Sequence, residues 1–276
     1  DMEWQRRFRP LESIYAGRIQ SHDHLRLVQN HFAPPNNSLG VTAFETYTRC
    51  PFRFFVNRLL GVDALEEVEE EVTALDRGIL LHAVVEQFYK ERYDAAGDCI
   101  APVSADGSER AAAEARLLAI AQQHLADMQF SGVFWETWRD SLLMGLEGYK
   151  PSGAAMGPGT LKTFIDREIA DPDWCRPRYF ESSFDAPGAP VHVGDVKING
   201  PTLEIRWKKD RVFHIKGKVD RIDCLQGADN LYFVVDYKSY AGRPGITPAA
   251  FFDAVNTGRD FQLPVYLLMA GGALGS

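Results

Sequence analysis

Apolar and polar residues recur with a helical period along much of residues 38–170. In the stretch TAFETYTRC, Thr42 and Glu45 have the spacing of a capping box. Pro51 then separates this helix from a second one, FRFFVNRLLG, which is predicted to end at Gly61. The same periodicity predicts further helices at 73–93, 108–130, 134–149 and 160–170.

One of these helices, TALDRGILLHAVVEQFYKERY, carries a histidine among apolar residues. The positions at spacings of three and four are Leu75, Ile79, His82, Glu86 and Tyr89. Residues at this spacing are expected to share one helical face. On its own, a histidine on such a face is either a hydrogen-bonded core residue or a functional group, and the pattern does not decide between them.

The period changes after FESSFD, where short runs rich in β-forming residues begin. These runs are TLEIRW, RVFHIKGKVDRIDCL and NLYFVVDYKSY, separated by Gly, Asp and Asn. A last helix is predicted to begin near Asp260 with FQLPVYLLMA. Helices followed by a strand meander and a final helix predict an α/β (α+β) fold, in which a sizeable helical subdomain packs on a mixed central sheet.

Composition narrows the class of protein. The formal charge is −8 and the sequence pI about 5.4, which excludes a globally basic nucleic-acid binder but permits a local basic surface. No apolar stretch is long enough to cross a bilayer and no signal peptide is evident, so a cytoplasmic protein is expected. The four cysteines, Cys50, Cys99, Cys175 and Cys224, are too widely spaced for a disulfide framework or a paired zinc site.

The run FVVDYKSY poses the main chemical question. Side chains alternate along a strand, so Asp236 and Lys238 are expected on one face, with Tyr237 pointing away. Asp220 lies in another alternating run, and the short connection between the runs favours antiparallel neighbours whose carboxylates meet. Two such carboxylates suit a hard cation such as Mg²⁺. The alternative is a buried ion pair between Asp236 and Lys238 that only closes the strand.

Two further segments, GILLHAVVEQFY and FQLPVYLL, bear on the choice between a metal site and a simple ion pair. In the second, Gln262 and Tyr266 are four residues apart and share a helical face. Together with TAFETYTRCPFRFFVNRLLGV, GKVDRID and VVDYKS, and in this order, these segments resemble the PD-(D/E)xK nuclease superfamily. The similarity is greatest to the RecB-like exonuclease domain at the C-terminus of AddB-type helicase–nuclease subunits, whose fold is that of the restriction endonucleases.

The resemblance implies roles for individual residues. The matching positions are His82, Asp220, Asp236, Tyr237, Lys238, Gln262 and Tyr266. The imidazole, the two carboxylates and the tyrosine carbonyl are the implied ligands of Mg²⁺ or Mn²⁺. The lysine is implied to orient or polarise the attacking water, and the last two residues to line the site. Glu181 falls where relatives often carry an acid, and its role stays open between structural and functional.

The resemblance also implies a function. We expect a metal-dependent DNA exonuclease module that hydrolyses phosphodiester bonds within a helicase–nuclease, in double-strand break processing and recombinational repair. Its partners would be single-stranded or unwound DNA ends and a helicase subunit or domain. The alternatives are a catalytically inactive nuclease-fold module that serves DNA binding or helicase contact, and a nuclease with no helicase host.

The resemblance runs from about Ser38 to the end of the chain, and the expected domain limits follow from it. Residues 1–37 are expected to be a linker or the remnant of an upstream region, and 38–276 the nuclease domain. Within it, the helical part covers about 38–170, and the catalytic sheet with the last helix about 178–276. Both ends of the sequence suggest a fragment, truncated at the C-terminus.

Cys50, in TRCPFRFF, matches the first ligand of a [4Fe–4S] cluster in AddB-type nucleases. The family's other three ligands follow the final helix, and Cys99, Cys175 and Cys224 do not reproduce their spacing. The resemblance therefore implies a cluster in the full-length parent, and we do not expect this fragment to form it.

A basic run supplies the predicted DNA track. Residues 206–218 carry six Lys or Arg against one Asp, interleaved with Trp207 and Phe213. The basic residues are Arg206, Lys208, Lys209, Arg211, Lys216 and Lys218, with Arg49, Arg53 and Arg58 near Cys50 as a second group. The alternative for the main run is a solvated hairpin.

Overall fold

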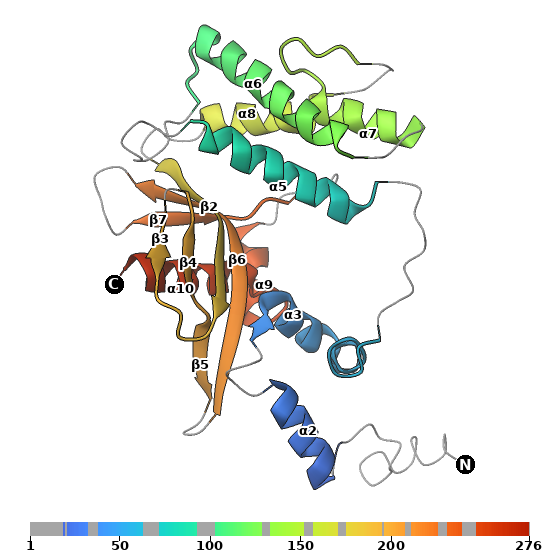
Figure 1. Ribbon diagram of the computed structural model, residues 1–276, viewed down its shortest axis with the longest axis vertical. Helices are drawn as coiled ribbons and strands as arrows, with labels where there is room; N and C mark the ends of the chain where they lie inside the picture. The colour runs from blue at the N-terminus through green and yellow to red at the C-terminus, as the bar shows by residue number, and fades with distance from the viewer. Residues whose placement is uncertain are drawn as a thin grey trace.

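The structure is a computed structural model in which a layer of helices lies across one end of a mixed sheet (Figure 1). The described residues are 19, 21–32, 38–62, 72–92, 103–128, 133–151, 157–170, 175–194, 196–207, 211–225, 231–238 and 247–275. None of the helices described combines the length and apolarity that crossing a bilayer requires.

The helical layer consists of α5 (Ala74–Lys90), α6 (Gly107–Ala126), α7 (Val133–Leu143) and α8 (Thr160–Ala170). The buried residues of α5 include Leu81, Val84 and Phe88, together with Tyr89 from the face that the spacing from Leu75 predicted. Leu75 and Ile79 are 71% and 60% exposed, so the prediction of one shared apolar face was wrong for them. The helix packs against α6 and against β2 of the sheet.

Helix starts also differ from the prediction. The helix α3 (Val41–Arg49) begins after Gly40 without a side-chain cap, so the predicted capping box at Thr42 and Glu45 is wrong. The chain enters this helix directly from a strand residue, because Gly40 pairs with Lys216. A capping box exists instead at α5, where Thr73 and Asp76 exchange hydrogen bonds.

Seven strands of the sheet lie within the described residues. They are β1 (Leu39–Gly40), β2 (Cys175–Ala186), β3 (His192–Val193), β4 (Ile198–Pro201), β5 (Leu203–Trp207), β6 (Arg211–Leu225) and β7 (Tyr232–Val235). The long strand β6 pairs first with β1 and β5, and later with β2 and β7. The β1–β6 and β2–β4 pairs are parallel and the others antiparallel, which confirms the mixed sheet.

The predicted meander matches β5, β6 and β7, and the β6–β7 pair is antiparallel as expected. The strand β2 was not predicted, although it pairs along most of its length with β6. Its register shifts near Pro177 and its backbone turns left-handed at Glu181, so the regular alternation that reveals a strand in sequence is interrupted.

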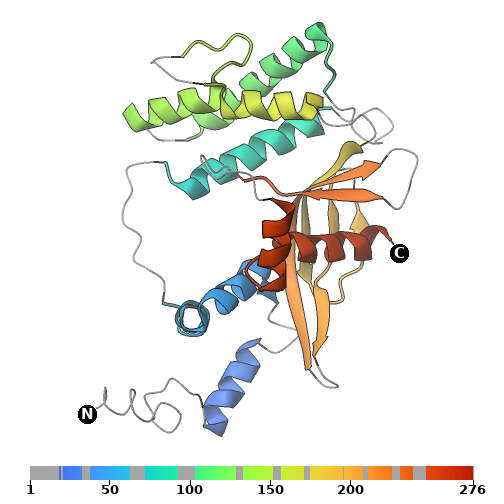
Figure 2. The ribbon, with the colours of Figure 1, turned by 180° about the vertical axis from the view of Figure 1, so that it is seen from behind.

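The remaining helical segments lie before and after the helical layer and the strands in sequence. They are α2 (His22–Phe32), α4 (Pro51–Phe54), the π-helical segment η1 (Phe55–Leu59), α9 (Pro248–Asn256) and α10 (Gln262–Leu274). Figure 2 shows α10 lying against the sheet. Its close approach depends on Gly217, because a Cβ there would meet the Tyr266 ring at 2.8 Å.

Two hydrophobic clusters form the core, one within the helical layer and one between the sheet and α10. The strand β2 enters both, with Phe180 in the first and Phe184 in the second. Polar residues are buried where the two clusters meet, and Arg221 of β6 is the most connected of those described.

Arg221 is 3% exposed and binds acids on two elements. Its Nε and Nη2 atoms donate to Asp223 at 2.5 and 2.7 Å, and Nη1 donates to Glu168 of α8 at 2.7 Å. Its guanidinium lies over the Tyr89 ring of α5, whose hydroxyl also donates to Glu168. This network, which we call the Arg221 clamp, fixes α5 and α8 on the sheet.

Replacing Arg221 with leucine should destabilise the fold by about 3–5 kcal/mol, because two buried carboxylates lose their cation. The matched control is Arg206→Leu, whose guanidinium is 79% exposed and pairs with Glu204. That change should cost less than about 1 kcal/mol. Urea unfolding of both variants measures the difference, and equal losses would contradict the role of the clamp.

Candidate active site

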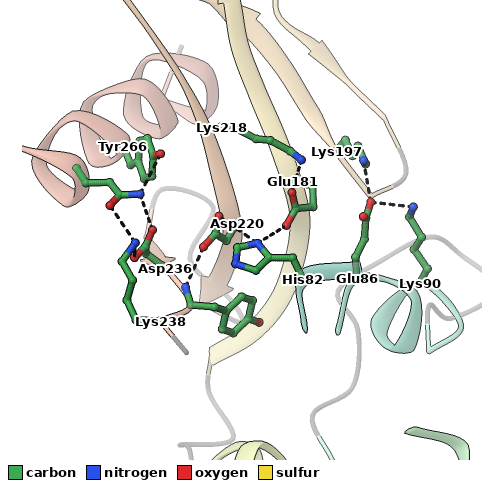
Figure 3. A network of polar contacts seen from close by, with 12 residues as sticks. His82, Glu86, Lys90, Glu181, Lys197, Lys218, Asp220, Asp236, Lys238 and Tyr266 are labelled. Atoms are coloured by element: carbon green, nitrogen blue, oxygen red, sulfur yellow. Dashed lines mark hydrogen bonds and ion pairs between the residues drawn. The ribbon is translucent and has the colours of Figure 1, made fainter. Parts of the chain in front are cut away.

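The candidate site lies where the helical layer meets the sheet. His82 comes from α5, Glu181 from β2 and Asp220 from β6, and the three side chains point toward one another (Figure 3). One ligand atom from each lies within 4.8 Å of the others. Residues separated by as many as 138 positions, from 82 to 220, therefore form one cluster.

The two carboxylates oppose each other across paired strands. Phe180 pairs with Arg221 and Ser182 with Val219, so the register places Glu181 opposite Asp220. Like charges in this arrangement destabilise a sheet unless a cation compensates them. Glu181 also has a φ of 49°, the left-handed region that non-glycine residues rarely adopt. Strain of this kind persists where the surroundings enforce it, typically at functional sites.

Protein cations partly neutralise this pair. The Nδ1 atom of His82 lies 3.0 Å from Glu181 Oε1 and 3.6 Å from Asp220 Oδ1. Lys218, next along the same face of β6, forms an ion pair with the other oxygen of Glu181. One turn beyond His82, Glu86 is paired with Lys90 and Lys197 at 2.8 and 2.7 Å and stands apart from the cluster.

Burial and charge shift the pKa values of all three groups. The hydrogen bond to Glu181 raises the pKa of His82, against the opposing effect of burial, and Asp220 raises it further. Burial raises the pKa of Asp220 to about 6. Burial also acts to raise the pKa of Glu181, but the hydrogen bonds from His82 and Lys218 outweigh it and leave that pKa below its ordinary value.

Beside this cluster lies a second group, at the end of β7. Asp236 and Lys238 form an ion pair at 2.6 Å, as their predicted common face requires. The amide of Gln262 joins them, since Nε2 donates to Asp236 at 2.7 Å and Oε1 accepts from Lys238 at 3.0 Å. The same Nε2 contacts the hydroxyl of Tyr266 at 3.2 Å, and burial raises the pKa of that phenol.

Tyr237 connects the two groups through its backbone. Its N–H donates to Asp220 Oδ2 at 2.9 Å, while its ring turns away into the helical core and its hydroxyl accepts from Arg221 at 3.2 Å. As predicted, the ring of Tyr237 points away from the side chains of Asp236 and Lys238. The predicted ligand role of its carbonyl stays a prediction.

The structure thus brings His82 and Asp220 together as the sequence predicted, and adds Glu181, whose role had been left open. Asp236 raises the pKa of Asp220 through its charge, but its oxygens contact Lys238 and Gln262. The sequence signal for Glu181 was weak, because it was a single acid in a segment that had not been predicted as a strand.

The donor set fits a hard divalent cation. One imidazole nitrogen and two carboxylate oxygens converge in a partly buried position, and such carboxylate-rich sites suit Mg²⁺ or Mn²⁺. A cation there would compensate the opposed carboxylates of β2 and β6 and replace the proton that His82 shares with Glu181.

The predicted basic track is only partly described. Lys208 and Lys209 lie outside the described residues, as does the side chain of Arg211. Arg206 pairs with Glu204 at 2.6 Å and Lys218 with Glu181, whereas Lys216 is exposed beside Gly217. The track therefore stays a prediction.

The second basic group surrounds Cys50. Arg53 and Arg58 line a small cavity of about 270 Å³, and Arg49 donates to the carbonyl of Arg259 at 2.9 Å. Cys50 itself is an exposed free thiol between α3 and α4, and its Sγ accepts a hydrogen bond from the Arg53 N–H.

Comparison with known proteins agrees with this geometry. A model of the PD-(D/E)XK nuclease superfamily matches residues 38–275. The chain is also similar to an ATP-dependent helicase/deoxyribonuclease subunit of Acetivibrio thermocellus, with 28% identity over 72% of the chain and 15% of the relative. The protein of the same name from Carboxydothermus hydrogenoformans is 24% identical over 86% of the chain and 18% of its own length. The chain thus spans under a fifth of these curated relatives.

Mn²⁺ affinity should rise with pH. A cation must displace protons from His82, whose pKa is raised, and from Asp220, whose pKa is about 6. Both protons are lost as pH increases, so affinity should grow roughly tenfold or more between pH 6 and pH 8. Isothermal titration calorimetry across this range measures the change, and a pH-independent affinity would contradict binding at these groups.

Asp220→Asn should stabilise the metal-free protein. The folded-state pKa of Asp220 is raised, so its ionised form costs stability, and that cost develops as pH rises from about 4 to about 6. At pH 8 the amide should gain on the order of 1–3 kcal/mol, while the rise in Tm caused by Mn²⁺ disappears. The control, Asp223→Asn, weakens the Arg221 clamp and should lower Tm. A lower Tm for both variants would argue against a stability cost of the ionised Asp220 carboxylate.

Proposed function

The chain belongs to the PD-(D/E)xK nuclease superfamily, and from this premise we propose that it is a metal-dependent DNA nuclease. It would hydrolyse phosphodiester bonds as the exonuclease module of a cytoplasmic helicase–nuclease that processes double-strand breaks for recombinational repair. The observation that carries the proposal is the convergence of His82, Glu181 and Asp220 next to the Asp236–Lys238 pair. The names of the similar ATP-dependent helicase/deoxyribonuclease subunits support the helicase–nuclease context of this proposal.

The metal would be held by the imidazole of His82 and the carboxylates of Glu181 and Asp220, with Asp236 and the carbonyl of Tyr237 as further candidates from the family resemblance. When bound, Mg²⁺ or Mn²⁺ lowers the pKa of a coordinated water and neutralises charge that develops on the phosphate. His82, Glu181 and Asp220 each already place one ligand atom within 4.8 Å of the others, so these three require little rearrangement.

The remaining polar groups have separate tasks in this proposal. The ammonium of Lys238, half exposed and directed by Asp236 and Gln262, would stabilise negative charge on the phosphate oxygens or orient the attacking water. Gln262 fixes the carboxylate of Asp236 and the amine of Lys238 at once. The hydroxyl of Tyr266, one turn further along α10, contacts the side-chain amide nitrogen of Gln262.

We propose that the DNA contacts include Arg206, Lys216 and Lys218, with the undescribed Lys208 and Lys209 and the side chain of Arg211. Lys218 would contribute to both the track and the site, because it already pairs with Glu181. Affinity for DNA should then fall steeply as salt concentration increases.

Cys50 belongs to a further part of the proposal. Its exposed thiol, at a break between two helices, is accessible to a metal cluster. We propose that it is the first ligand of a [4Fe–4S] cluster in the whole protein, as the family resemblance implies, and that a helicase subunit or domain delivers unwound ends to the site.

Removing the amine of Lys238 tests the catalytic assignment. Lys238→Ala should reduce Mg²⁺- or Mn²⁺-dependent cleavage of labelled linear DNA by about 100- to 1000-fold, because an electrostatic contact to the developing charge is lost. Asp236→Ala should have a similar effect. DNA affinity and the far-UV circular dichroism spectrum should change little in both variants.

The matched control is Lys90→Ala, which removes a lysine near the site whose partner Glu86 keeps Lys197. It should cleave at the wild-type rate. Wild-type cleavage by Lys238→Ala or Asp236→Ala would make the assignment wrong. A wild-type protein that binds Mn²⁺ and DNA without cleaving would favour the inactive binding module instead.

A further inference from the structure

Two cavities adjoin the Asp236–Lys238 pair. One, of about 620 Å³, is bounded by α5, α8 and the segment after β7, and the other, of about 480 Å³, by that segment, α9 and α10. Both are lined by Asp236 and Lys238. A substrate whose reacting group lies at this pair can therefore place neighbouring groups in either cavity.

The cavity beside α9 has an aromatic wall. Phe251 and Phe252 line it, with ring centroids 5.9 Å apart in a T-shaped arrangement. Phe252 is 62% exposed although it is a large apolar side chain beside a polar site. An exposed aromatic ring next to a phosphodiester-cleaving centre is suited to stack on a nucleobase.

Charge distinguishes this cavity from a phosphate site. Its polar lining residues are Asp236, Lys238, Asp260 and Gln262. Asp236 and Lys238 compensate each other as an ion pair, so the remaining charge is that of Asp260, which would repel a phosphate. A carboxylate can, in contrast, accept hydrogen bonds from the amino groups of bases. A neutral, planar group is therefore the better occupant.

The cavity beside α8 has the opposite character. Arg167 lines it and is exposed, and within the described part of the chain no ion pair occupies its guanidinium. The neighbouring acid, Glu168, is already bound by Arg221 and Tyr89 in the clamp. The free charge in this cavity is thus positive and suited to a phosphate.

We propose that these cavities are the two subsites that flank the scissile phosphate of a single strand. Resting on the proposed nuclease function, this deepens it by assigning the residues that receive a base and a phosphate of the strand. One nucleobase stacks on Phe252 in the cavity beside α9, and the next phosphate along the strand contacts Arg167 in the cavity beside α8. A base can enter the first cavity only when it is unpaired and unstacked, so the site selects single-stranded DNA over duplex.

The test measures binding separately from cleavage. A 12-nucleotide single strand with 2-aminopurine at successive positions is titrated with protein in Ca²⁺, and gel electrophoresis confirms that it stays intact. Stacking on Phe252 should quench the probe at one position. Phe252→Ala should remove that quenching and weaken binding roughly 5- to 100-fold, and Phe252→Trp should restore both.

Two controls match the substitutions. Phe134→Ala removes a phenylalanine that is 70% exposed on α7 and lines neither cavity, and its binding should equal wild type. Arg167→Ala should reduce the slope of log Kd against log salt by about 0.7, the value for one single-strand phosphate. Arg116→Ala, which removes an arginine paired with Glu91, should leave that slope unchanged.

The outcomes separate this inference from the nuclease assignment. Wild-type affinity and quenching in Phe252→Ala, or an unbound oligonucleotide, would overturn the subsites whatever the cleavage result. Equal affinity for the single strand and a 12-base-pair duplex would also overturn them. Specific quenching without Mn²⁺-dependent cleavage would sustain the subsites and contradict the nuclease function.

Discussion

The guanidinium of Arg221 contacts side chains from the helical layer and from the sheet, and the geometry of the site depends on that contact. It holds Glu168 of α8, lies over Tyr89 of α5, and donates to the hydroxyl of Tyr237. Tyr89 is two turns from His82 on the same helix, and Tyr237 directs its N–H at Asp220. One buried cation thus sets the distance between the imidazole of one layer and the carboxylates of the other.

The site that this contact assembles is electrostatically unfavourable without a bound cation. Glu181 and Asp220 face each other, Asp236 lies close enough to raise the pKa of Asp220, and Glu181 has a left-handed backbone. His82, Lys218 and Lys238 provide partial compensation. Because charge repulsion and strain of this kind lower stability, the arrangement is explained better by what it binds than by how it folds.

Sequence patterns predicted those parts of the fold whose periodicity is regular. Alternation located β5, β6 and β7, and the antiparallel β6–β7 pair followed from a short connection. The strand β2 escaped prediction because its register shifts near Pro177 and its backbone turns left-handed at Glu181, and Glu181 was overlooked together with the strand that carries it. The α5 face was misjudged at Leu75 and Ile79, since spacing identifies a stripe but not which stripe meets a neighbour. Convergence of His82 with Asp220 was expected from the family resemblance, and the helix alone could not have shown it.

The same physical reasoning bears on the alternative of an inactive binding module. A module that only bound DNA would gain from amides at positions 181 and 220, since amides keep the hydrogen bonds without the repulsion between carboxylates. It would also gain from more positive charge around the Asp236–Lys238 pair, where Asp260 instead adds a further acid. Acids concentrated on a surface that is proposed to receive a polyanion are explained when a divalent cation lies between them and the phosphate. The distribution of charge in this protein therefore favours catalysis over simple binding, independently of the motif that the acids form.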